Sequence, residues 1–195
     1  MDNSSLSDSG ASNILAAQHR RIEQLFLDAS ADPGSVNVPI YDEFRKTLLR
    51  HIAIEENIVL PLLRKHLRGG FPMELQLRME HDALAALCVL PPTIEVLFSL
   101  HALLIRHDRL EEAHGTLYDL FDDCVRRETD NIPEQIATFR ETATPRYINN
   151  PLAIEYARRA IARAGYDQNA LMEEGKAARD SDSHRNRLSP DSGQR

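Results

Sequence analysis

The sequence contains no tryptophan, and aromatic residues make up only 6% of its 195 residues. A core must therefore be built mainly from Leu, Ile, Val and Ala, which favours helices. No apolar run approaches the roughly 20 residues of a membrane-spanning helix. The N-terminal segment lacks the basic and hydrophobic regions of a secretory signal. We therefore expect no membrane partner.

Positive charge and cysteine are also scarce. The 23 Lys and Arg residues are outnumbered by 30 Asp and Glu residues, which gives a formal net charge of −7. This balance argues against a nucleic-acid partner, because such a partner requires a dense basic surface. The two cysteines, Cys88 and Cys124, form no paired motif. We therefore expect no disulfide framework and a cytoplasmic location.

Apolar residues recur at helical spacing in four stretches, residues 11–30, 39–67, 72–90 and 93–127. No stretch alternates with a period of two for long enough to predict a sheet. Short connections between four amphipathic helices are typical of a bundle. The sequence therefore predicts an all-α fold with an up-down-up-down four-helix bundle over residues 11–128.

The flanking segments have weaker patterns. Residues 1–10 and 178–195 are polar and poor in apolar residues, so we expect both to be disordered. Residues 129–177 are expected to form a helical C-terminal extension, with short helices near 133–142 and 150–164. We assign no function to the tail.

Two stretches share the pattern His-x3-Glu-Glu: His51 is followed by Glu55, and His107 by Glu111. On a helix, residues i and i+4 lie on one face, so each stretch presents an imidazole beside a carboxylate. We estimate the chance of two such matches among eight histidines at about one in a thousand. The pair is therefore a specific signal, whereas each match alone is weak.

The other two expected helices carry His19 and His81 near their middle, so the order His, His-x3-Glu occurs twice. In an antiparallel bundle these histidines fall at similar heights. Two carboxylates buried together without a cation would repel each other. Six nitrogen and oxygen donors exceed the needs of one zinc and suit two six-coordinate metals such as iron or manganese. We predict metal ligation by His19, His51, Glu55, His81, His107 and Glu111, with the two Glu bridging.

Other candidate residues receive structural interpretations. We expect Glu23 to orient His19 from outside the site or to face solvent. His114 lies on the ligand stripe and is left open as an alternative ligand or an outer partner. We expect Glu56 and Glu112 to flank the site and His101 to lie at its rim. Tyr118 and Cys88 are expected to pack in the core, and His66 to lie at a helix C-terminus, where a cation is favourable.

The ordered motif resembles the hemerythrin-like (HHE cation-binding) family. Further similarities are His19-Arg20-Arg21-Ile22-Glu23 and Glu80-His81-Asp82. The resemblance covers roughly residues 11–128 and implies two non-haem iron ions with an oxo or hydroxo bridge. Oxygen-carrying hemerythrins have a second His four residues away on the third helix, where this chain has Leu77 or Ala85. The pattern is closer to four-His, two-Glu variants.

We therefore expect a di-iron protein that binds or reacts with dioxygen, nitric oxide or peroxide, in sensing, stress response or iron handling. The sequence does not choose among these roles and identifies no protein partner. Manganese or zinc remains open as the metal. The alternative is a helical interaction module with a structural zinc, and the third hypothesis is a bundle without metal.

Overall fold

The computed structural model describes residues 10–32 and 34–188. Over these residues the secondary structure is helical, without strands, as the apolar spacing predicted. The elements are α1 (Ser12–Ala29), α2 (Val38–Ile54), the π-helical turn η1 (Glu55–Val59), α3 (Leu60–His66), α4 (Glu74–Val89), α5 (Ile94–Glu112), α6 (Leu117–Val125), α7 (Ile132–Ala137), α8 (Pro151–Arg163) and α9 (Gln168–Leu188).

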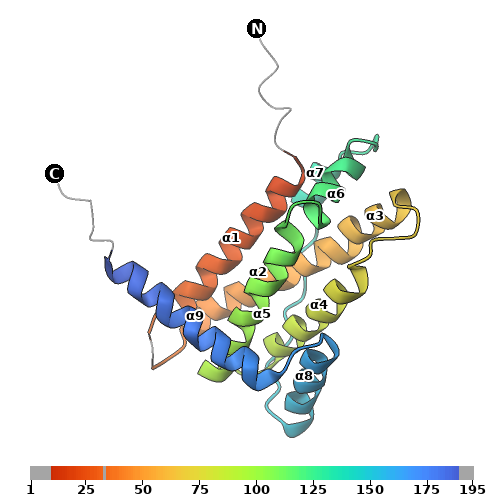
Figure 1. Ribbon diagram of the computed structural model, residues 1–195. Helices are drawn as coiled ribbons and strands as arrows, with labels where there is room; N and C mark the ends of the chain where they lie inside the picture. The colour runs from red at the N-terminus through yellow and green to blue at the C-terminus, as the bar shows by residue number, and fades with distance from the viewer. Residues whose placement is uncertain (1–9, 33, 189–195) are drawn as a thin grey trace, which may run out of the picture.

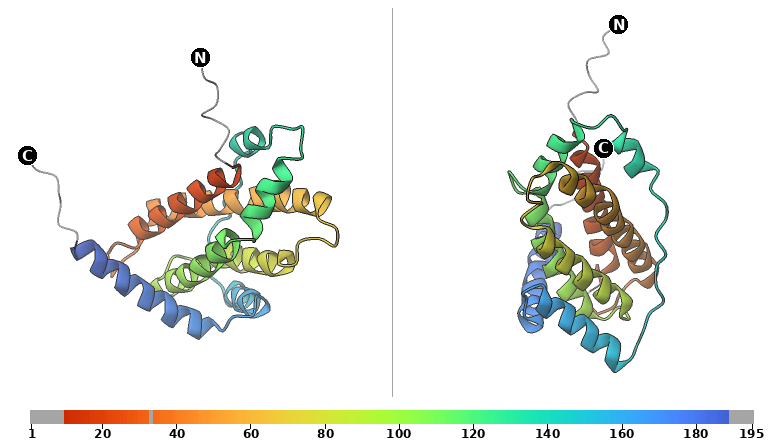
Figure 2. Two further views of the ribbon diagram at one scale, coloured as in Figure 1. Left: turned by 45° about the horizontal axis from the view of Figure 1, so that its top comes forward. Right: turned by 90° about the vertical axis from the view of Figure 1, so that its right-hand side faces the viewer.

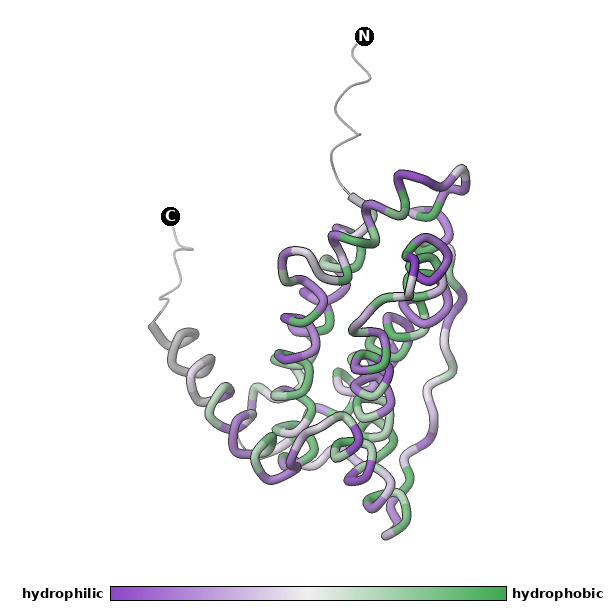
Figure 3. Tube along the Cα trace, turned by 45° about the vertical axis from the view of Figure 1, so that its right-hand side comes forward, coloured by the Kyte–Doolittle hydropathy of each residue, from purple (hydrophilic) through white to green (hydrophobic). Residues whose placement is uncertain are grey.

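Helices α1, α2, α4 and α5 lie side by side and form the body of the molecule (Figure 1). Each of them contacts two of the others, so the contacts close a ring from α1 through α2, α4 and α5 back to α1. Apolar residues line the inner faces of these helices, as the hydropathy colouring shows (Figure 3). Polar residues that face the central axis of this ring are therefore buried and must find partners there.

Local sequence signals set the helix ends. The side chains of Asn37 and Thr93 accept hydrogen bonds from the backbone N–H of Ile40 and Val96 and cap α2 and α5. Past the end of α3, Gly69 and Gly70 have φ of 92° and 77°, a conformation that other residues rarely adopt. The expected helix over 39–67 is thus observed as the continuous rod α2–η1–α3.

The expected continuous helix over 93–127 is wrong in one respect, because it breaks between α5 and α6. Gly115 has φ of 79°, and the Thr116 hydroxyl donates to the backbone carbonyl of Glu111 at 2.9 Å. A side chain that bonds a helical carbonyl competes with continuation of the helix. The chain therefore changes direction before α6, which packs against α1, α3 and α5.

The C-terminal extension covers the bundle. A segment without regular structure, residues 138–150, runs along α2 (Figure 2) and accepts hydrogen bonds from Arg50 at Phe139 O (2.9 Å) and from Arg45 at Pro145 O (2.6 Å). Helix α8 then packs on α4, and α9 packs across α5. The extension is therefore attached along the length of the molecule.

Two predictions about the extension need correction. The helix expected over 133–142 is shorter, because α7 ends at Ala137. Helix α9 continues to Leu188, although disorder was expected from residue 178. The earlier part of α9 packs on the bundle: Leu171 is buried, and Arg179 donates to the carbonyl of Asp32 at 2.8 Å. Residues 1–9 and 189–195, where disorder was also expected, lie outside the described residues.

The buried apolar residues form two clusters. One cluster includes Phe26, Phe44 and Leu84, and the other includes Leu15 and Phe121. The predicted ligands lie where the helices pass from one cluster to the other. In the described part of the chain, no helix has both the length and the apolar content needed to cross a membrane.

Candidate metal centre

The six predicted ligands converge at the axis of the bundle. All are buried, with exposed fractions of 4% for His19, 3% for His81, 1% for His51 and His107, and 0% for Glu55 and Glu111. They come from α1, α2, η1, α4 and α5, so the site exists only in the assembled bundle. Six ionisable residues without water access require a strong compensating interaction.

The two carboxylates lie between two pairs of histidines. On one side, Glu55 Oε1 is 3.2 Å from His51 Nε2 and Glu111 Oε2 is 3.3 Å from His19 Nε2. On the other side, Glu55 Oε2 is 3.2 Å from His81 Nε2 and Glu111 Oε1 is 3.2 Å from His107 Nε2. Each carboxylate therefore presents one oxygen to each half of the site, as a bridging ligand would.

These contacts define two groups of four potential ligands that share Glu55 and Glu111. The first group adds His19 and His51, and the second adds His81 and His107. In each group the ligand atoms all lie within 4.8 Å of one another. The arrangement thus brings the six candidate ligands into two groups that are joined by two carboxylates.

The π-helical turn η1 begins at Glu55, one turn after His51. The backbone N–H of Leu60 bonds the carbonyl of Glu55, which is five residues earlier, and the side-chain amide of Asn57 donates to Ala53 O at 2.7 Å. Wide turns of this kind inside α-helices occur frequently at functional sites. Here the wide turn begins at the residue shared by both halves of the site.

Each of the four candidate ligand histidines also donates from its other nitrogen, Nδ1, to a residue outside the group. His19 donates to Glu112 Oε1 (2.6 Å) and His81 donates to Glu56 Oε1 (2.7 Å). Such bonds fix the ring orientation and leave Nε2 facing the metal position. The expectation that Glu56 and Glu112 merely flank the site is wrong, because each bonds a histidine of another helix.

The two remaining histidines have outer partners that the sequence did not reveal. His107 Nδ1 donates to Glu80 Oε2 (3.0 Å), and His51 Nδ1 donates to the amide oxygen of Gln18 (2.9 Å). Glu80 and Gln18 each directly precede a ligand histidine in the sequence. Glu23, expected to orient His19 or to face solvent, is exposed.

Charges in the metal-free site compensate one another. Burial alone would lower the pKa of His19, but the carboxylates of Glu111 and Glu112 outweigh it and raise this pKa to about 11. Burial alone would raise the pKa of Glu55, yet the charges and contacts of His51 and His81 hold it well below its usual value. The pKa of His81 is likewise raised, so without a metal, protons on His19 and His81 supply positive charge beside the two carboxylates.

Four central atoms nevertheless lack a hydrogen bond within the described residues: Glu55 Oε2, Glu111 Oε1, His81 Nε2 and His107 Nε2. Buried polar atoms are rarely left unsatisfied in native proteins. All four belong to the second group of potential ligands, and imidazole nitrogen with carboxylate oxygen is a donor set that suits iron, manganese and zinc. The residues therefore fit a bound metal.

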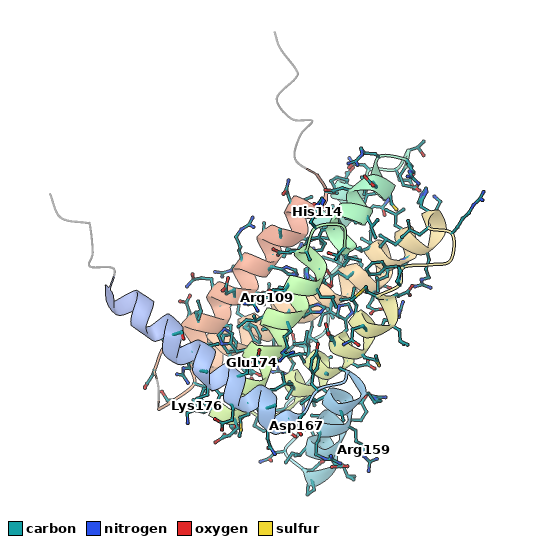
Figure 4. The ribbon with its side chains drawn as sticks, viewed as in Figure 1. Arg109, His114, Arg159, Asp167, Glu174 and Lys176 are labelled. Carbon is teal, nitrogen blue, oxygen red and sulfur yellow. The ribbon has the colours of Figure 1, made fainter. Side chains whose placement is uncertain are left out.

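Three further histidines of the described residues lie away from the site. His114 is fully exposed in the turn after α5 (Figure 4), where its ring contacts Asp119 at 2.8 Å, so it is neither a ligand nor an outer partner here. His101, expected at the rim, is buried and stacks on Phe26 with ring centroids 4.7 Å apart. His66 pairs with Glu128 near the end of α3.

Tyr118 is a site residue that the sequence interpretation assigned to the core. Its hydroxyl oxygen lies 2.9 Å from His19 Nε2, and its ring stacks on the His19 ring. Burial, followed by the charges of Glu55 and Glu111, raises the pKa of this phenol well above its usual value. The spacing of seven residues from Glu111 was the only sequence signal, and it is equally typical of core packing.

Comparison with known proteins identifies the first part of this site. Residues 11–90 match the family model described as the hemerythrin HHE cation binding domain. No curated protein and no solved structure matches the chain. The match contains His19, His51, Glu55 and His81, and the bundle adds His107 and Glu111 to the same buried cluster. Residues 11–90 are therefore similar to the hemerythrin HHE cation binding domain, and the buried His and Glu groups of the chain fit a metal site.

Proposed function

We propose that this chain is a non-haem di-iron protein that binds or reacts with a small ligand of the class of dioxygen, nitric oxide or peroxide. The observation that carries the proposal is the pair of buried ligand groups sharing Glu55 and Glu111. A buried pair of bridging carboxylates is typical of sites that hold two metals in helical bundles. We further propose the up-down-up-down topology for the four helices that supply the ligands.

The donors suit iron, manganese and zinc, and the similarity to the hemerythrin family favours iron among these metals. Each group offers two imidazoles and two shared carboxylates, fewer donors than a six-coordinate metal accepts. Solvent or a small exogenous ligand can complete such a metal. When bound, two ferrous ions would supply two electrons to an oxidant.

The protein residues would hold, orient and enclose the metals. Outer bonds from Glu112, Glu56, Glu80 and Gln18 keep the four rings in place. The two apolar clusters on either side of the site exclude water. Burial of every ligand to 4% exposure or less favours small ligands over bulky substrates.

Metal analysis tests this proposal. Protein purified without oxygen should contain two irons per chain and should develop near-ultraviolet bands when oxygen is admitted. Glu55→Ala should lose at least one iron, because Glu55 contacts histidines of both halves. Glu23→Ala, at an exposed position on α1, is the matched control and should retain both. Zinc without a spectral response would support a structural metal, and no metal at all would refute the proposal.

A further inference from the structure

The hydroxyl of Tyr118 lies among the proposed ligands, outside the family match that ends at residue 90. Besides its 2.9 Å approach to His19 Nε2, this oxygen is 3.4 Å from Glu55 Oε1 and 3.5 Å from Glu111 Oε2. The side chain is 6% exposed. Its oxygen therefore faces the same two carboxylate oxygens that face His51 and His19.

The break between α5 and α6 places the phenol there. Thr116 bonds back to Glu111, and the Gly115 N–H donates to Asp119 Oδ2 at 2.7 Å, so the connection is held at both ends. Helix α6 then packs on α1, α3 and α5, and the Tyr118 ring stacks on His19 with centroids 5.4 Å apart. Tyr118 is thus a fixed part of the site.

The spacing of these atoms suits shared coordination. Donors at about 2.1 Å from a six-coordinate metal lie about 3 Å from their neighbours. His19 Nε2 lies 2.9 Å from His51 Nε2 and 2.9 Å from the Tyr118 oxygen. We propose, on the basis of the proposed metal pair, that Tyr118 is a further ligand of the metal held by His19 and His51. The phenol binds as phenolate, and its proton passes to solvent.

A hydrogen-bonding role explains the contacts less well. An O–H bond to a carboxylate is typically about 2.5–2.7 Å long, whereas both carboxylate contacts of Tyr118 are 3.4 Å or longer. In the metal-free protein the protonated His19 can donate from Nε2 to the phenol oxygen, but this bond is lost when a metal takes the Nε2 lone pair. Because His19 Nδ1 already donates to Glu112, Nε2 cannot serve both the phenol and a metal.

Ligation by Tyr118 makes the two halves unequal. The half built by His19 and His51 then has five protein donors, whereas the half built by His81 and His107 has four. The half built by His81 and His107 consequently has more open coordination positions for an exogenous ligand. The chain itself would direct small ligands to that half.

The test is the spectrum of the ferric protein. Wild type loaded with iron and then oxidised should show a visible phenolate-to-iron charge-transfer band and resonance-enhanced phenolate ring vibrations. Tyr118→Phe should lose both signals while circular dichroism shows the fold intact. Tyr41→Phe is the matched control: Tyr41 is also buried, it stacks on Phe44 in one apolar cluster, and its removal should change neither signal.

The outcomes separate the two proposals. Two irons per wild-type chain without a phenolate signal would overturn ligation by Tyr118 and leave the proposed function standing. A phenolate signal that persists in Tyr118→Phe would also overturn it. A chain that binds no iron would overturn both proposals. The wild-type spectrum alone is decisive if the variant does not fold.

Discussion

Each of the four proposed ligand histidines uses both ring nitrogens, one toward the site and one toward an outer acceptor. Three of the acceptors are carboxylates, Glu112, Glu56 and Glu80, whereas His51 donates to the neutral amide of Gln18. A carboxylate acceptor raises the basicity of the imidazole more than an amide does. The environments of the four histidines therefore differ although their inner contacts are alike.

The outer acceptors should affect metal affinity. We expect Glu112→Ala to weaken metal binding about 10–100-fold, because it removes the acceptor that orients His19. Competition against a chelator of known affinity measures this change. The control is Glu23→Ala, which alters the exposed carboxylate that the sequence offered as a partner of His19. Equal weakening in both variants would contradict the assignment of Glu112.

The metal-free protein should have a stability maximum between about pH 4.5 and 6.5. The pKa values of Glu55 and Glu111 are lowered in the folded protein. These carboxylates therefore stabilise the fold when the pH is above the usual pKa of a glutamate, and this stabilisation is lost as the pH falls below that pKa. The pKa of His19 is raised to about 11 in the folded protein. The stability that this group contributes is therefore complete below about pH 6.5 and is lost as the pH rises toward 11.

Thermal melts of chelator-treated protein from pH 3 to pH 9 measure this profile. Glu111→Gln should flatten the acid side of the profile, because an amide has no charge to lose at low pH. An unchanged acid side in this variant would mean that other carboxylates govern the acid response. In the presence of metal, affinity should rise with pH because histidine protons must leave before binding.

At the scale of elements, a hydrogen-bonded path joins the C-terminal extension to a ligand. Tyr166, between α8 and α9, donates to Glu80 Oε1 at 2.5 Å, and Glu80 Oε2 accepts from His107. Gln76 adds bonds to Glu80 Oε1 and to Ala164 O. The position of the extension and the orientation of His107 are therefore coupled through Glu80.

Tyr166→Phe should weaken metal binding severalfold, less than loss of a direct histidine partner, because Glu80 retains its bond from Gln76. Metal titration followed by calorimetry measures the effect. The matched variant Tyr156→Phe, at an exposed position on α8, should bind like the wild type. No difference between the two variants would show that the extension does not influence the site.

At the scale of the whole molecule, α9 holds the extension against the bundle. Gly175 packs so closely on α5 that a Cβ added there would lie 1.9 Å from the carbonyl oxygen of Phe98. Nearby, Arg106 on α5 pairs with Glu174 on α9 at 2.6 Å, and Figure 4 labels Glu174 where α9 crosses α5. Close approach of the two helices therefore depends on the absence of a side chain at one position.

Gly175→Ala should destabilise the protein by about 1–3 kcal/mol, because the added carbon forces α9 away from α5. Chemical denaturation measures this change, and Lys176→Ala, at the next and exposed residue, is the control. Metal stoichiometry should be unchanged, since the six predicted ligands come from other elements. A variant as stable as the wild type would contradict the close packing.

The sequence by itself determined the helical class, the approximate helix positions and the six central side chains. Those features depend on local spacing: a period of 3.6 residues marks the buried faces, and four residues bring His51 beside Glu55. The tertiary structure alone decided the outer partners and the place of Tyr118. Gln18, Glu80 and Glu112 bond histidines on other helices, and Tyr118 reaches the site only because the chain turns after α5. Such contacts depend on helix rotation and on a loop conformation, which periodicity does not encode.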